Sequence, residues 1–377
     1  MKDQRYLLIV DDEPDIRFIL GDYLKNNGFI PILAENGREA LTLLNHVSPD
    51  VIISDILMPE MDGLEFLQEI QRRGLEIPVI LMTAYATIDR AVEAMKSGAA
   101  DFITKPLKLN YLIQVIRRVC KQFELERLVL EQEQQLKADL RLASLVQRCM
   151  LPADVENKHF GFYLRYEPLL EIGGDSIATR LYSEEMIAVA LYDVTGHGVS
   201  AALLASLLHH ELTDLLAQPI RPLDIIRQIN LFASEKFSAT GLFCTMALIW
   251  LDTNRMTLTA VNAGHPSILL WKNESREFEA VSSHMPPIGL LSEDDFKTDL
   301  SCLSLSPKDR ILLYTDGFTE SRQKNGDILG EDRFVQIVQT CIQSSPRECM
   351  DRIFQEAAQS RQGNPRDDLT LVLLEVK

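Results

Sequence analysis

Residues 186–204 read MIAVALYDVTGHGVSAALL, and the rest of the chain is organised around this stretch. Its apolar run predicts a buried strand that delivers Asp193 into a turn containing Gly196, His197 and Gly198, and a helical pattern follows. A sharp glycine-rich turn allows side-chain and main-chain oxygens to converge on a hard divalent cation. The same residues also fit a plain strand-to-helix connection with Asp193 as a turn residue. Whether Asp193 is a metal ligand or a turn residue therefore depends on the other acids of the chain.

The surrounding region, residues 152–377, has a β-rich pattern. Its apolar runs predict antiparallel strands in a sandwich, and pairs of amphipathic segments predict helices that cover the sheets. We therefore expect an α+β layered β-sandwich here. The predicted strands contain MIAVALYD, LFCTMALIWLD, RMTLTAVNAG, SILLW, RILLYTDG and DLTLVLLEV, and the predicted helices cover about 199–217, 221–236, 331–343 and 346–361.

Four aspartates of this region stand at predicted strand ends or in adjoining glycine-rich turns. They are Asp175 in EIGGDS, Asp193 in LYDVTGHG, Asp316 in LYTDGFTE and Asp367 in NPRDDLTLVLL. Each acid taken alone is most simply a turn residue. A set of carboxylates without clustered His or Cys favours Mg²⁺ or Mn²⁺ over zinc. Two such ions can ionise a shared water and clamp the oxygens of a phosphate ester, so the set indicates phosphate-ester hydrolysis.

The order and spacing of these motifs resemble the metal-dependent serine/threonine phosphatases of type 2C, the PPM family, and in particular its bacterial SpoIIE-type branch. The motifs are YDVTGHG followed by SAALL, then NAGHPSILLW, PPIGLL, YTDGFTE, ILGEDRF and DDLTLVLL. The resemblance implies two Mn²⁺ or Mg²⁺ ions that share Asp193, with the Val194 carbonyl completing one site. It also implies that Asp316 and Asp367 hold the other site and that Asp175 acts at the second ion. Asp368 occupies the position beside the ligand Asp367.

One position departs from the SpoIIE-type pattern. That branch usually continues its GGD with an aromatic pair and another aspartate, whereas this chain has Ser176, Ile177 and Ala178 after Asp175. In the SpoIIE-type branch this carboxylate either only supports the turn or helps to hold the second ion. In the first case its loss leaves activity intact, and in the second case its loss lowers metal affinity. We interpret His197 as a turn residue or an indirect support, since the acids already make an oxygen-rich site.

The first 120 residues alternate short apolar runs with amphipathic stretches. This alternation predicts a doubly wound α/β domain of five parallel strands, whose ligand site lies at the carboxyl ends of the strands. Asp11 and Asp12, Asp55, Thr83 and Lys105 stand at four of those ends. The predicted strands include 6–10, 51–55, 77–83 and 101–105, and the predicted helices cover Glu13 to Asn27, Gly37 to His46, Gly63 to Arg73 and Ile88 to Ser97.

These strand-end residues resemble the CheY-like receiver domain of two-component response regulators over residues 5–120. The resemblance implies that Asp55, in SDILMPEMDG, accepts a phosphoryl group, and that Lys105 pairs with that group. It also implies a cis Lys105–Pro106 bond. The remaining implied roles are Mg²⁺ binding by Asp11, Asp12, Asp55 and the Leu57 carbonyl, a hydrogen bond from Thr83 to the phosphoryl group, and a switch aromatic at Phe102.

Between the two regions, residues 109–151 contain neither glycine nor proline and predict one long helix. Val129, Leu136, Ala143 and Met150 recur every seven residues, which is typical of a coiled coil, although 131–135 is wholly polar. We expect either a dimerising signal helix, and hence a homodimer, or a solvated spacer. Its end, LRLASLVQRCMLP, resembles the helix that enters many regulated phosphatase domains.

Composition narrows the range of partners. The net charge of −17 argues against nucleic acid, because such binding depends on Lys and Arg neutralising phosphates. The six cysteines show no CxxC spacing, as is usual for reduced thiols. The first residues predict no signal peptide, and no apolar run reaches the roughly 20 residues of a membrane span. We expect a cytoplasmic protein with no membrane partner.

Together these patterns predict a response regulator with three parts: a receiver domain at 1–120, a helical linker and possible coiled coil at 121–151, and a phosphatase domain at 152–377. A sensor histidine kinase or phosphotransfer protein would supply the phosphoryl group. The substrate would be a phosphoserine or phosphothreonine protein, and the resemblance suggests a STAS-type anti-sigma-factor antagonist in a partner-switching pathway. The alternative is a phosphorylation-gated adaptor whose phosphatase-like domain is a non-catalytic binding surface. The direction of control stays open.

Overall fold

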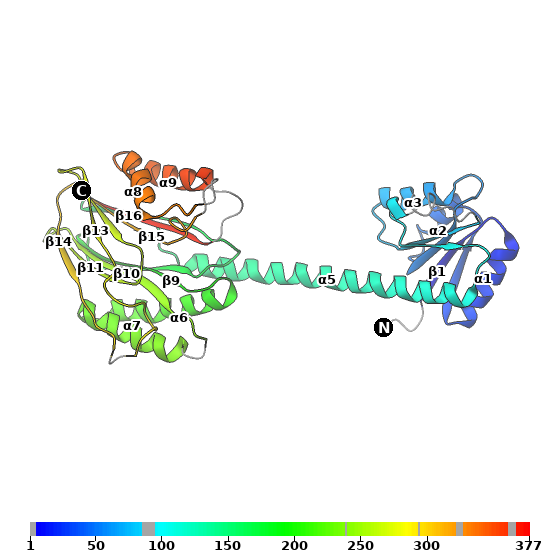
Figure 1. Ribbon diagram of the computed structural model, residues 1–377, viewed down its shortest axis with the longest axis horizontal. Coiled ribbons are helices and arrows are strands. Elements are labelled where there is room, and N and C mark those ends of the chain that lie inside the picture. Colours follow the sequence, from blue (N-terminus) through cyan, green and yellow to red (C-terminus); the bar gives the residue numbers. More distant parts are fainter. Residues whose placement is uncertain (1–4, 85–94, 238–239, 293–294, 322–326, 361–366) are drawn as a thin grey trace. The chain divides into compact units, whose positions relative to one another are not determined.

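The computed structural model describes residues 5–84, 95–237, 240–292, 295–321, 327–360 and 367–377. It divides into two compact units, Met1–Leu136 and Lys137–Lys377 (Figure 1). Most of the helix expected over Ile88 to Ser97 lies outside the described residues. Among the described residues, no helix combines the length and the apolar character that crossing a bilayer requires.

The first unit is built on a five-stranded parallel sheet, as the sequence predicted, and the strands lie in the order β2-β1-β3-β4-β5. Apolar residues fill β1, β3 and β4, which are buried on both faces by helices. Parallel pairing places the ends of β1, β3, β4 and β5 at one edge of the sheet. The elements are β1 (Arg5–Val10), α1 (Pro14–Asn26), β2 (Phe29–Ala34), α2 (Gly37–Leu43), β3 (Val51–Asp55), α3 (Gly63–Arg72), β4 (Val79–Thr83) and β5 (Asp101–Thr104).

The predicted long helix is confirmed as α5 (Leu109–Met150), which runs for 42 residues without a break. Its first turns bury Leu112, Val115 and Ile116 against the receiver sheet. Farther along, large apolar side chains are exposed, among them Val129 at 55% and Leu136 at 59%. Exposed apolar residues are what a coiled-coil seam needs, but coiled-coil pairing and dimerisation stay predictions.

The second unit contains two antiparallel sheets. One has the order β14-β11-β10-β9-β8 and the other β13-β12-β15-β16-β7-β6. Several of these strands were not anticipated from the sequence, notably β7, β8, β13 and β14. The strands are β6 (Val155–Glu156), β7 (Phe160–Glu167), β8 (Asp175–Leu181), β9 (Met186–Val194), β10 (Cys244–Asp252), β11 (Thr257–Ala263), β12 (Ile268–Lys272), β13 (Glu277–Val281), β14 (Ser301–Ser304), β15 (Arg310–Tyr314) and β16 (Leu369–Val376).

Three apolar layers hold this sandwich together. The inner faces of the two sheets bury side chains such as Leu191, Leu313 and Val372 against one another. One helix pair packs on the outer face of the first sheet and the other pair on the outer face of the second (Figure 1). The predicted layered architecture is therefore confirmed. The helices are α6 (Val199–Leu216), α7 (Pro222–Phe237), α8 (Glu331–Cys341) and α9 (Pro346–Ser360).

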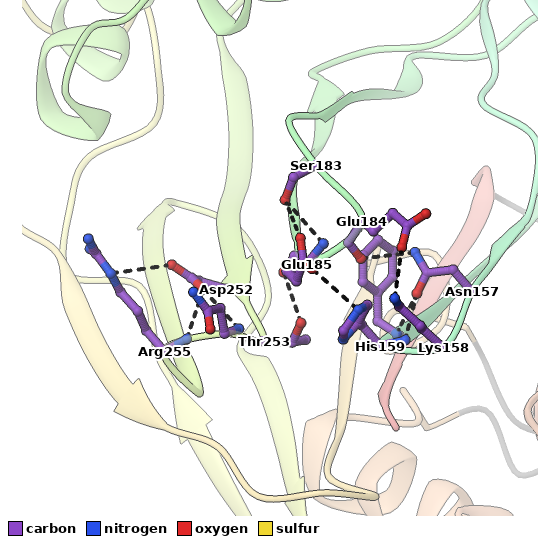
Figure 2. A network of polar contacts seen from close by, with 11 residues as sticks. Asn157, Lys158, His159, Ser183, Glu184, Glu185, Asp252, Thr253 and Arg255 are labelled. Carbon is purple, nitrogen blue, oxygen red and sulfur yellow. Dashed lines mark hydrogen bonds and ion pairs between the residues drawn. The ribbon is translucent and has the colours of Figure 1, made fainter.

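A polar network fastens the turns at one end of the sandwich (Figure 2). The Glu185 carbonyl accepts hydrogen bonds from the backbone N–H and the hydroxyl of Thr253, at 2.9 and 3.0 Å. The Asn157 amide donates to the Glu184 carbonyl at 3.1 Å, and His159 Nε2 lies 3.4 Å from Glu185 Oε1. The β8–β9 turn is thus held at the end of the hairpin opposite to Asp175 and Asp193, which pair across its open end.

Candidate functional sites

The receiver acids meet at the carboxyl edge of the parallel sheet. Asp11 follows β1 and Asp55 ends β3, and both side chains are buried. Lys105 Nζ donates to Asp11 Oδ2 at 2.9 Å and to Asp55 Oδ2 at 2.7 Å. One ligand atom each from Asp11, Asp12 and Asp55 falls within 4.8 Å of the others. The sequence-predicted triad is therefore close enough to offer ligands to a single ion.

The charges of this site are partly balanced. Burial raises the pKa of Asp11, and the hydrogen bond from Lys105 offsets only part of that effect. Burial alone would lower the pKa of Lys105, but its hydrogen bonds to Asp55 and Asp11 outweigh burial and hold that pKa above its ordinary value. A lysine that remains charged leaves an excess of carboxylate oxygens, and such a set of hard ligands suits Mg²⁺.

The other receiver positions border the same edge. Thr83 is buried at the end of β4, and Phe102 is half-buried in β5. The Lys105–Pro106 bond is cis, as the resemblance implied. Leu57 lies in the exposed turn after β3, with its side chain directed to solvent. Thr83 thus ends the strand that pairs with the strand ending at Asp55, and the roles of all these residues stay predictions.

In the second unit, Asp175 and Asp193 pair directly across the end of the β8–β9 hairpin. Asp175 is 2% exposed, and its Oδ2 accepts hydrogen bonds from Thr315 Oγ1 at 2.9 Å and from the hydroxyl of Thr370. Both threonines belong to the other sheet. Asp175 therefore joins the two sheets at the edge where the predicted metal ligands gather.

The predicted ligands of this second site repel one another. Burial, with repulsion from Asp316 and Asp367, raises the pKa of Asp193 to about 8. Burial and repulsion from Asp367 raise the pKa of Asp316 to about 6. The pKa values of Asp175 and Asp367 also lie above the ordinary range, in both cases mainly because of burial. Neighbouring carboxylates that resist ionisation are the arrangement that a divalent cation relieves.

These acids are spread more widely than the receiver triad. Among the residues that the structure describes, only Asp11, Asp12 and Asp55 bring three acidic ligand atoms within 4.8 Å. The acids of the second unit come from the β8–β9 hairpin, the turn after β15 and the position two residues before β16. Whether this partly buried carboxylate set holds one ion or two stays a prediction.

Several contacts that support this site have no clear signal in the sequence, including those of Asp368, which the motif places only beside Asp367. Asp368 Oδ2 accepts the backbone N–H of Gly174 at 2.7 Å, and its Oδ1 accepts that of Leu169 at 2.7 Å. It therefore anchors the loop before Asp175 and is not directed at solvent. Thr315 and Thr370 had a weak signal, since Thr315 directly precedes Asp316 and Thr370 stands three residues after Asp367, but only the folded register brings them to Asp175.

His265 is another supporting residue that was not identified from the sequence. It lies in the NAGHP motif, is buried, and its Nδ1 lies 2.8 Å from Thr245 Oγ1. Burial lowers its pKa to about 3, so the ring stays neutral. Its backbone N–H donates to Asn262 Oδ1, which fixes the turn after β11. His197, by contrast, is exposed in its turn, in agreement with its interpretation as a turn residue.

Ala178 lies on the other face of β8 from Asp175. Its side chain belongs to the apolar layer under α6, together with Ala190 and Tyr192. Ile177 contributes instead to the layer between the sheets, which is the face that Asp175 shares by strand alternation. A carboxylate at position 178 would therefore enter the α6 layer and not join the acids between the sheets.

A parallel α/β unit with a lysine-bridged acid triad, followed by a four-layer sandwich with buried aspartates, defines a receiver joined to a PPM-type phosphatase domain. The family model for Stage II sporulation protein E (SpoIIE) matches residues 183–377, and that for the response regulator receiver domain matches residues 7–117. The chain belongs to the SpoIIE family and carries a response regulator receiver domain. The SpoIIE match begins after Asp175.

Individual proteins agree with this assignment. The regulatory protein AtoC of Escherichia coli K12 is 30% identical over 290 residues, which is 74% of this chain and 58% of AtoC. The chain thus spans little more than half the length of that relative. The SiaA-PP2C domain of Pseudomonas aeruginosa covers 65% of this chain and 98% of its own, with 21% identity and a TM-score of 0.56.

A second solved structure has the same fold. The RsbU and RsbW domains of Rv1364c from Mycobacterium tuberculosis cover 60% of this chain and 63% of their own, with 21% identity and a TM-score of 0.52. At this level of identity the two structural similarities establish the fold alone. The architecture of the second unit is therefore that of PP2C-type phosphatase domains.

Proposed function

We propose that the chain is a response regulator whose Asp55 phosphorylation controls a metal-dependent protein serine/threonine phosphatase. The observation that carries the proposal is the group of aspartates with raised pKa values, of which Asp175 is buried and Asp193, Asp316 and Asp367 are partly buried. A binding surface alone has no use for desolvated, mutually repelling carboxylates, which cost stability unless a cation binds them. The adaptor alternative is therefore less well supported than catalysis.

Each acid has its own part in the proposed site. Asp193 and Val194 lie at the end of β9. Asp193 would be shared by two Mn²⁺ or Mg²⁺ ions, the Val194 carbonyl would complete one site, Asp316 and Asp367 would hold the other, and Asp175 would act at the second ion. Bound there, the ions supply an ionised water and a clamp for the phosphate oxygens. Thr315 and Thr370 hold the Asp175 carboxylate in one orientation. The protein residues thus fix the geometry in which the phosphoserine or phosphothreonine ester meets the water.

The receiver would supply the switch. A sensor histidine kinase or phosphotransfer protein would donate the phosphoryl group to Asp55, with Mg²⁺ held by Asp11, Asp12, Asp55 and the Leu57 carbonyl. Thr83 and Lys105 would bind the new phosphoryl oxygens, and Phe102 would respond to their movement. The substrate we propose, a phosphorylated STAS-type anti-sigma-factor antagonist, follows from family resemblance. A homodimer through α5 would let two receivers act on two phosphatase domains.

The phosphatase activity is tested with the purified full chain and Mn²⁺. We expect phosphate release from a phosphoserine peptide, and Asp193→Ala should lower the rate on the order of 10³-fold, because the shared ligand stabilises charge on both sides of the reaction. Asp332→Ala, an exposed acid in the first turn of α8, is the matched control and should keep the wild-type rate. Equal rates for wild type and Asp193→Ala, with and without Asp55 phosphorylation, would favour the adaptor.

The substrate class needs a separate comparison. A phosphorylated STAS-domain protein and an unrelated phosphoprotein are offered at equal concentration, and initial rates of phosphate release are measured. We expect the STAS protein to be hydrolysed faster at limiting concentration. Equal rates would leave the phosphatase assignment intact and remove the STAS assignment.

A further inference from the structure

The last turn of α5 contacts the loop that carries Asp175. Gln147 Nε2 donates to the Gly173 carbonyl at 2.8 Å, and the Gly173 N–H donates back to Gln147 Oε1 at 3.2 Å. One side-chain amide thus holds both polar groups of one backbone residue. Gln147 is 7% exposed, whereas its neighbours Leu145 and Val146 are 60% and 66% exposed. Only this side of the last turn faces the sandwich.

The clamped loop leads directly to the predicted metal ligands. A Cβ on Gly173 would lie 2.0 Å from Asp368 Oδ2 and 2.6 Å from the Tyr166 hydroxyl, so the backbone is enclosed there as well; the same hydroxyl lies 3.5 Å from Gln147 Oε1. A Cβ on Gly174 would lie 2.7 Å from the Val194 carbonyl oxygen and 3.1 Å from Asp193 Oδ1. Because there is no free space around either glycine, a shift of the loop must move its neighbours.

Hydrogen bonds also join this loop to the residues around the proposed metal site. The Val194 N–H donates to the Gly174 carbonyl at 3.3 Å, and Asp368 accepts the N–H groups of Gly174 and Asp175. The loop is therefore fixed between α5 on one side and the proposed ligands on the other. The contact at Gln147 is the point where the helix that begins in the receiver touches this assembly.

We propose that Gln147 is a positioning residue for the phosphatase site: it fixes Gly173, and through it Asp175 and the Asp193–Val194 edge, so that the orientation of the last turn of α5 sets the metal affinity. The inference rests on the proposed function. A rotation of α5 would break the clamp and loosen the loop, and restoring the rotation would rebuild it. In this proposal the receiver acts on the phosphatase site through the hydrogen bonds between Gln147 and Gly173.

The test compares Gln147→Met, which keeps the size of the side chain and removes its hydrogen bonds to Gly173 and to the Tyr166 hydroxyl, with Gln134→Met on an exposed part of the same helix. In the full chain, hydrogen exchange of the amides of residues 169–176 should accelerate in Gln147→Met and stay unchanged in Gln134→Met. Calorimetry should give Mn²⁺ affinity weakened about 10- to 100-fold, the usual effect of losing a partner that orients a metal ligand.

Regulation supplies the third measurement. Treating Asp55 with an acyl-phosphate mimic should change the phosphatase rate of wild type and Gln134→Met by the same ratio, whereas the ratio for Gln147→Met should approach one. Unchanged loop exchange and unchanged Mn²⁺ affinity in Gln147→Met would overturn the clamp, whether or not the wild type is active. An inactive wild type with the expected exchange and affinity changes would instead overturn the proposed function alone.

A folding defect is separated by a second variant. Gln147→Glu retains the acceptor for the Gly173 N–H and loses the donor to the Gly173 carbonyl. If Gln147→Met accelerates exchange throughout the sandwich, Gln147→Glu is used in its place, and an effect confined to residues 169–176 supports the clamp. Exchange in Gln147→Glu that is the same as in the wild type overturns it.

Discussion

The two acidic centres of this chain solve the same electrostatic problem in different ways. At the receiver edge, Lys105 reaches Asp11 and Asp55 at 2.9 and 2.7 Å, so the protein supplies its own cation. At the phosphatase edge, burial and mutual repulsion raise the pKa values of Asp193 and Asp316 to about 8 and about 6. The first centre thus balances part of its charge within the protein, whereas we expect the second to depend on ions from solution.

Removing the protein's own cation should have the largest effect. Lys105→Met leaves the buried Asp11 and Asp55 without their partner, and we expect the receiver to lose about 3 kcal/mol of stability. Hydrogen exchange of the β1 and β3 amides in the full chain measures this loss, since slow core amides report global opening. Added Mg²⁺ should restore part of the stability, because it takes over the neutralisation.

The matched control for this change is Lys108→Met, since Lys108 is exposed three residues farther along the chain. It should leave exchange in β1 and β3 at the wild-type rate. Equal protection in both variants would mean that the receiver carboxylates tolerate one another without Lys105. The contrast between the two centres would then disappear.

The second-largest effect is expected at the phosphatase centre, when a neutral hydrogen-bond donor to its carboxylates is removed. Thr370→Val keeps the shape of the side chain but removes a hydrogen bond to the buried Asp175 carboxylate. We expect Mn²⁺ affinity to fall about 10- to 100-fold by calorimetry, because the ionised form of Asp175 loses support. Thr259→Val, in a half-buried part of β11, should leave the affinity unchanged. An equal fall in both variants would point to a general loss of packing.

Much of this contrast could be predicted from the sequence because its signals are local. Asp55 and Asp193 each follow a short apolar run, and such runs predict buried strands whose ends gather at one edge of the sheet. The glycines beside Asp175 and Asp193 predict the turns. Local pattern was therefore enough to find the acids and the order of the layers.

The supports of those acids could not be found in this way. Thr370 reaches Asp175 across the gap between two sheets, and Gln147 reaches Gly173 from a helix that ends before the sandwich begins. Both contacts depend on how sheets and helices pack, which no spacing in the sequence encodes. Ala178 teaches the same lesson, because only the observed alternation of β8 shows that it faces the α6 layer and not the acids.

The smallest expected difference between the two centres is in the pH dependence of their metal affinity. A cation must displace the proton that Asp193 holds below about pH 8, so Mn²⁺ affinity should rise by up to about tenfold per pH unit between about pH 6 and 8 and then level off. At the receiver, Lys105 stays charged throughout this range, and we expect Mg²⁺ affinity to rise less steeply. Calorimetry of Mg²⁺ with Asp193→Ala measures the receiver site against a weakened phosphatase site.

The stability of the metal-free protein should change with pH in the opposite direction: it should fall as the pH rises. The pKa of Asp193 is raised from an ordinary 3.8 to about 8 on folding, so the folded state binds the proton more tightly than the unfolded state. The stability that this proton provides is complete below about pH 4 and is lost as pH rises through about 8. Chelated wild type should therefore unfold more easily at pH 8 than at pH 6, and Asp193→Asn should reduce that difference. A difference that is the same in both proteins would show that Asp193 ionises freely without an ion, and the phosphatase centre would then be no more dependent on cations than the receiver.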